Sequence, residues 1–147
     1  MGFSGLGLAL SLAVFAPNLL LLRFPPRPPI GHVEVPTVFV ILERAGQALC
    51  VTVPAITVGA SMRWWWLIPV TVLVLGYWGL WVRFLAAGRP LEALFGPVLG
   101  VPVPMALLPV ATFLAGAVWL ANPWVAIAAV VLAVGHIPSS VITARSR

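Results

Sequence analysis

Five runs of apolar residues divide the chain, and polar, proline-containing or glycine-containing stretches separate them. The runs span residues 3–22, 36–59, 64–87, 102–121 and 123–143. A helix that crosses a bilayer needs about 20 mostly apolar residues, and each run has about that length. The pattern predicts an all-α integral membrane protein in which residues 1–147 form a single bundle of five transmembrane helices. The alternative is a bundle of four spans plus one interfacial or re-entrant segment.

Two long and two short connections join these runs. Residues 23–35 are rich in proline, which prevents helix and favours a stiff, extended path. Residues 88–101 contain the sequence PLEALF, which predicts a short interfacial helix with Pro90 in its first turn. Residues 61–63 and 122–123 are so short that they predict two antiparallel hairpins. One hairpin pairs the second helix with the third, and the other pairs the fourth with the fifth.

Composition supports the membrane assignment and narrows the partners. Hydrophobic residues make up 62% of the chain and charged residues only 7%, whereas soluble domains carry about 25% charged residues. The net charge is +5 and comes from arginines at the ends of the apolar runs, with no lysine. Because no basic stripe is interleaved with aromatic residues, we exclude a nucleic-acid partner and expect membrane lipids instead.

The arginines also predict an orientation. Five spans place the termini on opposite sides, and one side receives Arg23, Arg27, Arg83, Arg89, Arg145 and Arg147. The other side receives Arg63 alone. The positive-inside rule then places both long connections and the C-terminus in the cytoplasm, with the N-terminus outside a plasma (inner) membrane. Five tryptophans fall at the predicted outer helix ends as an aromatic belt: Trp64, Trp65, Trp66, Trp119 and Trp124.

The first apolar run is read as a retained helix rather than as a cleaved signal peptide. It lacks a positive segment at its start. Cleavage after Ala16 would also place Pro17 directly beyond the broken bond, which is a poor site.

An adjacent acid and base, Glu43 and Arg44, lie inside the second apolar run. A charge within the hydrocarbon costs roughly 2.5–3.5 kcal/mol on insertion scales, so charged residues there are rare and usually functional. Gln47 lies four residues after Glu43 and therefore shares its helix face. The second helix is expected to carry a polar wedge into the cytoplasmic half of the bundle.

Polar and aromatic residues of two other helices fall at the same depth. Tyr77 and Trp81 form a stripe on the third helix, and His136 lies in the inner part of the fifth, one turn before a break expected at Pro138. Arg83 shares a face with Gly76 and Gly79, and these glycines are expected to admit a neighbouring helix and bring Arg83 inward. We predict that Glu43 and His136 are catalytic acid–base groups. The predicted substrate-binding residues are Arg44, Gln47, Tyr77, Trp81 and Arg83.

Structural interpretations of the same residues stay open. Glu43 can form a helix-locking ion pair with Arg44 or Arg83, and the arginines can extend to lipid headgroups. The aromatic residues can form an inner aromatic belt. The sequence has no metal-binding or nucleophile motif and a lone Cys50, so no metal or cofactor is expected.

Three function classes fit these observations. In the first, the protein binds or converts a lipid-like or isoprenoid-like molecule through a polar site in the cytoplasmic leaflet. In the second, it is a subunit of a proton-coupled transporter, because an intramembrane glutamate can carry protons. In the third, it is a non-catalytic accessory or scaffold protein that acts with a partner membrane protein or as a homo-oligomer. These classes include both enzymes and non-catalytic proteins.

Overall fold

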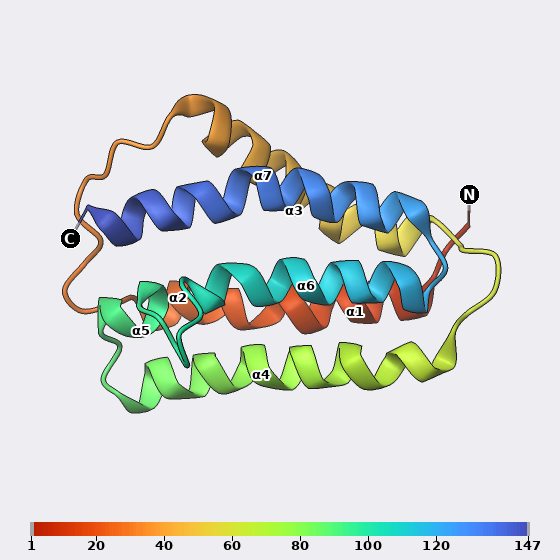
Figure 1. Ribbon diagram of the computed structural model, residues 1–147, viewed down its shortest axis with the longest axis horizontal. Helices are drawn as coiled ribbons and strands as arrows, with labels where there is room; N and C mark the ends of the chain where they lie inside the picture. The colour runs from red at the N-terminus through yellow and green to blue at the C-terminus, as the bar shows by residue number, and fades with distance from the viewer. Residues whose placement is uncertain (1, 147) are drawn as a thin grey trace.

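The computed structural model describes residues 2–146, and these residues form helices, turns and one isolated β-bridge between Val98 and Val101. The long helices lie side by side along the bundle axis (Figure 1). The elements are α1 (Gly5–Phe15), η1 (Ala16–Leu19), α2 (Leu20–Arg23), α3 (Thr37–Ile56), η2 (Trp64–Trp66), α4 (Leu67–Ala86), α5 (Leu91–Phe95), α6 (Pro104–Trp119) and α7 (Pro123–Arg145). The start of α1 and the end of α7 lie at opposite ends of the bundle.

The bundle has three layers, and α1 and α6 form the middle one (Figure 1). On one side of this layer, α4 packs against α6. On the other side, α3 packs against α1, and α7 packs against α6. The most extensive helix contact joins α3 to α7. The largest fully buried side chains come from three of these helices, namely Phe84, Phe113 and Leu132.

A proline in η1 helps to attach the first helical run, Gly5–Arg23, to α4. Pro17 lies in η1 and has no N–H, so the carbonyl of Ala13 loses its ordinary helical donor. The indole N–H of Trp78 donates to that carbonyl at 2.8 Å. The helical run Gly5–Arg23 therefore changes to a 3-10 turn at Pro17 while remaining bonded to its neighbour.

A second proline joins α3 to α1 in the same way. Pro54 leaves the carbonyl of Cys50 without its helical donor, and the Ser11 hydroxyl donates to that carbonyl at 2.8 Å. Gly7 lies directly against the Pro54 carbonyl, where a Cβ atom would collide. Ser11 and Cys50 are both buried, so the bond joins the two helices inside the core.

The predicted hairpin between the second and third helices is wrong. The two helices, α3 and α4, do not pack along each other. The reason is that α3 ends at Ile56, and residues 57–63 cross the end of α6. Arg63 donates its backbone N–H to the Trp119 carbonyl at 2.8 Å during this crossing. The predicted hairpin between the fourth and fifth helices, α6 and α7, is confirmed.

Four helical runs are long and apolar enough to cross a membrane: Gly5–Arg23, Thr37–Ile56, Trp64–Ala86 and Pro123–Arg145. The remaining long helix, α6, has 16 residues and is shorter than these four. The short helix predicted within residues 88–101 is present as α5, with Pro90 as its N-cap residue. Large apolar side chains such as Val72, Ile127 and Val130 are exposed on the outside of the bundle. A bundle that is apolar outside as well as inside is typical of helices surrounded by lipid.

Candidate functional site

The candidate site begins with the close approach of α3 and α7. A Cβ atom at Gly46 would collide with the backbone of Leu132, and a Cβ atom at Gly135 would collide with the backbone of Glu43. Each helix thus contributes one glycine, and the two glycines lie one helical turn apart along the interface. The backbones can meet only because both positions lack a side chain.

This contact brings an imidazole to a carboxylate. His136 follows Gly135 on α7, and its Nδ1 atom lies 2.7 Å from Oε1 of Glu43. The side chains are partly covered, with exposed fractions of 23% for His136 and 24% for Glu43. Within residues 2–146 this is the one close contact between an acidic and a basic side chain, and it is an ion pair only when the imidazole is protonated. Arg44 is the other basic side chain that acts on the Glu43 carboxylate. The ion pairs considered from the sequence, Glu43 with Arg44 or with Arg83, are therefore not formed.

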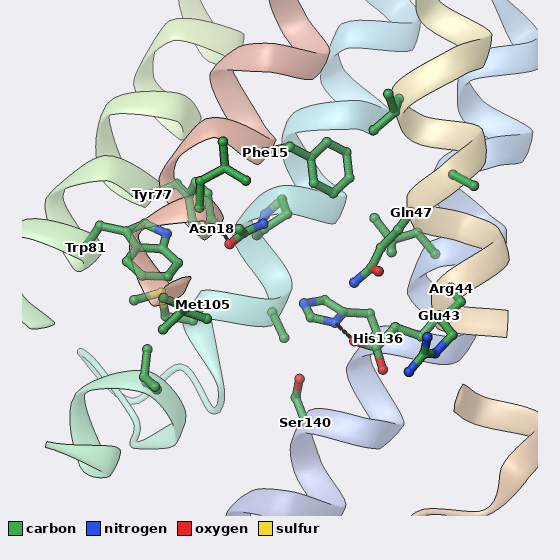
Figure 2. Close-up of a pocket in the computed structure, with 18 of the residues that line it drawn as sticks. Phe15, Asn18, Glu43, Arg44, Gln47, Tyr77, Trp81, Met105, His136 and Ser140 are labelled. Carbon is green, nitrogen blue, oxygen red and sulfur yellow. Dashed lines mark hydrogen bonds and ion pairs between the residues drawn. The ribbon is translucent and has the colours of Figure 1, made fainter. Parts of the chain in front are cut away.

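A cavity of about 700 Å³ lies beside this pair. Its polar wall consists of side chains from α3 and α7, namely Glu43, Arg44, Gln47, His136 and Ser140. Across the space lie side chains of the other helices, among them Phe15, Asn18, Tyr77, Trp81 and Met105 (Figure 2). Pockets for small organic ligands measure about 300–1,000 Å³ and are mostly apolar with a few polar groups. The cavity has that size and composition.

Hydrogen bonding and ring packing fix the wall opposite the Glu43–His136 pair. The Tyr77 hydroxyl donates to Oδ1 of Asn18 at 2.7 Å, which joins α4 to η1. Tyr77 and Trp81 pack edge to face with their ring centroids 6.3 Å apart. Trp81 packs in the same manner on Phe84, at 5.7 Å. The result is a rigid aromatic wall that faces a carboxylate and an imidazole.

The cavity opens sideways between the helical run Gly5–Arg23 and α3. Leu19 of η1 and Ala48, Val51 and Thr52 of α3 line it and are exposed. Ile30, from the proline-rich connection, also lines the cavity and is exposed. The opening is therefore edged mainly by apolar side chains on the outer face of the bundle. Leu94 and Phe95 of α5 line another part of the cavity.

Most of the residues singled out in the sequence lie around this one cavity, and Arg83 does not. The lining includes Glu43, Arg44, Gln47, Tyr77, Trp81 and His136. Arg83 is exposed on α4 and is not part of the lining. The expected close helix contact is absent, because nothing lies within 4 Å of a Cβ atom built at Gly79. The α4 face that reaches the cavity is the one that carries Tyr77 and Trp81.

Sequence reasoning missed Asn18, which lies on the far wall and accepts from Tyr77. A usable signal was present, because Asn18 is the one amide side chain in the apolar run 3–22. Met105 and Phe15 were also missed, and nothing in an apolar pattern distinguishes such residues from ordinary core residues.

The described residues contain no group of three His, Cys, Asp or Glu side chains that could hold a metal ion. The side chains that line the cavity supply hydrogen bonding, proton exchange at the Glu43–His136 pair and contact with aromatic faces. Comparison with protein-family models, with curated proteins and with solved structures gives no match to this chain.

Proposed function

We propose that this chain is a five-span integral membrane protein whose cavity binds an amphipathic, lipid-like molecule. The observation that carries the proposal is the cavity itself, which combines the Glu43–His136 pair on one wall with an aromatic wall opposite and an apolar lateral opening. A ligand with an apolar chain and a polar end fits that division. Its polar end lies at the Glu43–His136 pair, and its chain lies along the aromatic wall or passes out through the opening.

The outer surface of the bundle supports the membrane part of the proposal. Four helices have the length and apolar character of spans. The remaining long helix, α6, has 16 residues, or about 24 Å at 1.5 Å per residue, against a hydrocarbon thickness of about 30 Å. A bilayer can thin locally around such a short helix at modest cost. We therefore propose that α6 is also a span.

The arginine distribution supports the proposed orientation. Arg23, Arg89 and Arg145 lie at or near the ends of α2, α4 and α7, at the end of the bundle that also contains α5. Arg63 lies at the opposite end, just before η2. Under the positive-inside rule the end with α5 is cytoplasmic, which places the cavity in the inner leaflet.

The lateral opening favours ligand binding over a purely structural role for the polar residues. A helix-locking ion pair needs no cavity beside it, and a packed core rarely leaves a space of this size. Removing a polar head from water is unfavourable unless it is hydrogen-bonded, and the Glu43–His136 pair supplies such a partner. Proton exchange at this pair also makes conversion of the bound molecule chemically accessible.

A matched pair of variants tests the proposal. Ala48 and Ala45 are both exposed on α3, but only Ala48 lines the cavity. Ala48→Trp should fill the opening, whereas Ala45→Trp adds the same side chain outside it. The wild type and both variants are purified in mild detergent, and bound lipid is identified by native mass spectrometry.

We expect the wild type and Ala45→Trp to retain one enriched lipid species, and Ala48→Trp to lose it at least about tenfold, which corresponds to about 1.4 kcal/mol of binding free energy. If all three proteins carry the same lipids in the proportions of the bulk membrane, the binding proposal fails. The accessory role, with Glu43–His136 as a helix lock, would then be the better account.

A further inference from the structure

The orientation of the His136 ring determines which of its atoms faces a ligand. Nδ1 is occupied by the Glu43 carboxylate at 2.7 Å. The second ring nitrogen, Nε2, points across the cavity toward the wall that carries Asn18 and Met105 (Figure 2). An ionised carboxylate can only accept hydrogen bonds, so the proton of a neutral imidazole is held on Nδ1. Nε2 then presents a lone pair to the cavity and requires a donor.

Two further polar groups of the same wall have no partner among the described residues. The Gln47 amide and the Ser140 hydroxyl both line the cavity, and neither forms a hydrogen bond within residues 2–146. Both can donate to an acceptor on a ligand. The wall thus offers one acceptor, His136 Nε2, and two donors that can bind a second polar atom.

The charges on this wall disfavour an anionic head. Arg44 is the one guanidinium in the lining, it is exposed, and it lies beside the Glu43 carboxylate. Recognition of phosphate ordinarily uses clustered arginines, backbone N–H groups or a metal ion. With the His136 imidazole neutral, the wall has no second cation, and its carboxylate would repel a phosphate. A neutral head that carries a hydroxyl matches the available groups.

We propose that the ligand of this cavity is an uncharged long-chain alcohol whose hydroxyl donates to Nε2 of His136. The inference rests on the proposed function and names its ligand class. Glu43 is a positioning residue that holds the imidazole in the accepting tautomer. Gln47 and Ser140 bind the remaining polar atoms of the head. A prenyl alcohol and a diacylglycerol share this chemistry, and the experiment separates them.

The test compares ligands that differ only at the head. The protein is placed in nanodiscs, and the binding of farnesol is compared with that of farnesyl methyl ether and farnesyl monophosphate. A diacylglycerol and its methyl ether form the second arm. Each comparison is repeated with Ala48→Trp, which reports whether binding takes place in the cavity. His136→Phe removes the acceptor, and His32→Phe, in the exposed connection, is its control.

We expect at least one alcohol to bind about tenfold more tightly than its ether. His136→Phe should abolish this preference, and His32→Phe should preserve it. The arm that shows the preference identifies the alcohol as prenyl or glyceride. Equal binding of alcohol and ether, with both blocked by Ala48→Trp, overturns the inference and leaves the proposed function standing. Tightest binding of the monophosphate also overturns it. Absence of any binding that Ala48→Trp can block counts against both proposals.

A spectroscopic measurement tests the positioning role of Glu43 without ligand. The chain has only two histidines, so ¹⁵N-labelled imidazole gives few signals. We expect His136 to show one nitrogen without a proton at Nε2, and Glu43→Gln to produce a mixture of tautomers. Glu34→Gln, in the exposed connection, should leave the spectrum unchanged. A His136 spectrum that Glu43→Gln does not alter would show that the carboxylate does not set the tautomer.

Discussion

Gly135 of α7 lies against the backbone of Glu43 in α3, at a distance that leaves no room for a Cβ atom. This contact places the next residue, His136, where its Nδ1 atom reaches the Glu43 carboxylate at 2.7 Å. The polar wall of the cavity therefore depends on a residue that has no side chain. Gly46 makes the corresponding contact with Leu132 one turn along the same interface.

Gly135→Ala should destabilise the bundle. The added methyl group collides with backbone, which cannot move aside like the end of a flexible side chain. Overpacking of this kind typically costs 1–3 kcal/mol, about the range expected here. The measurement is the free energy of unfolding in mixed detergent micelles. Gly79→Ala on α4 is the matched control, because nothing lies within 4 Å of its new Cβ atom. Equal stability of the two variants would contradict the close contact.

Ser11→Ala should destabilise the contact between α1 and α3, because it leaves the Cys50 carbonyl without the hydroxyl donor that replaces the missing N–H of Pro54. An unsatisfied buried acceptor costs about 1–3 kcal/mol. Pro54→Ala supplies a backbone donor to the same carbonyl, so Ser11→Ala should cost less in that background. Unfolding free energies of the two single variants and the double variant give the coupling. Ser61→Ala, in the exposed connection, is the control, and strict additivity would argue against a shared acceptor.

Tyr77→Phe should lower stability by about 1 kcal/mol, because Oδ1 of Asn18 loses the hydroxyl that donates to it at 2.7 Å. The double variant Tyr77→Phe with Asn18→Leu should recover most of that loss, since neither polar partner is then left unpaired. Unfolding of the wild type and of both variants in mixed micelles measures both effects. A double variant that is less stable than Tyr77→Phe alone would show that Asn18 has another structural role.

Cysteine labelling tests the proposed topology. The natural Cys50 is buried, so the wild type serves as the blank for a membrane-impermeant maleimide. Leu99→Cys precedes α6 and Pro123→Cys follows it, and both positions are exposed. If α6 crosses the membrane, Pro123→Cys should be labelled from outside in intact cells and Leu99→Cys only after lysis. Labelling of both positions from the same side would show that α6 does not span, leaving four spans.

The sequence was sufficient for the helical passes because each apolar run is long and has polar ends. It also placed Glu43, Tyr77 and His136 at one depth, and these three residues do line one cavity. The sequence could not predict which face of α4 turns toward the bundle. Arg83 was expected to face inward beside Gly76 and Gly79, but neither glycine receives a neighbouring backbone. Helix rotation depends on which partner packs against which face, and an apolar run on all sides carries little information about that choice.

The sequence predicted only part of the order of the helices in space, namely the pairing of α6 with α7. A short connection predicted that the second and third helices are neighbours, and the true connection is longer because α3 ends at Ile56. The extended residues 57–63 then cross the end of α6. The glycine contacts that join α3 to α7 involve residues far apart in the chain, Gly46 and Gly135. No local pattern indicates which helix approaches each of these glycines.

Photo-crosslinking with a long-chain alcohol that carries a diazirine near its hydroxyl tests the central claim, ligand binding at the Glu43–His136 wall, most directly. After irradiation of the protein in nanodiscs, mass spectrometry maps the modified peptides. We expect labels on the cavity-lining parts of α3 and α7 around Glu43 and His136, and their loss in Ala48→Trp but not in Ala45→Trp. Labels confined to outward-facing residues such as Val72 and Ile127, equally strong in both variants, would contradict the account.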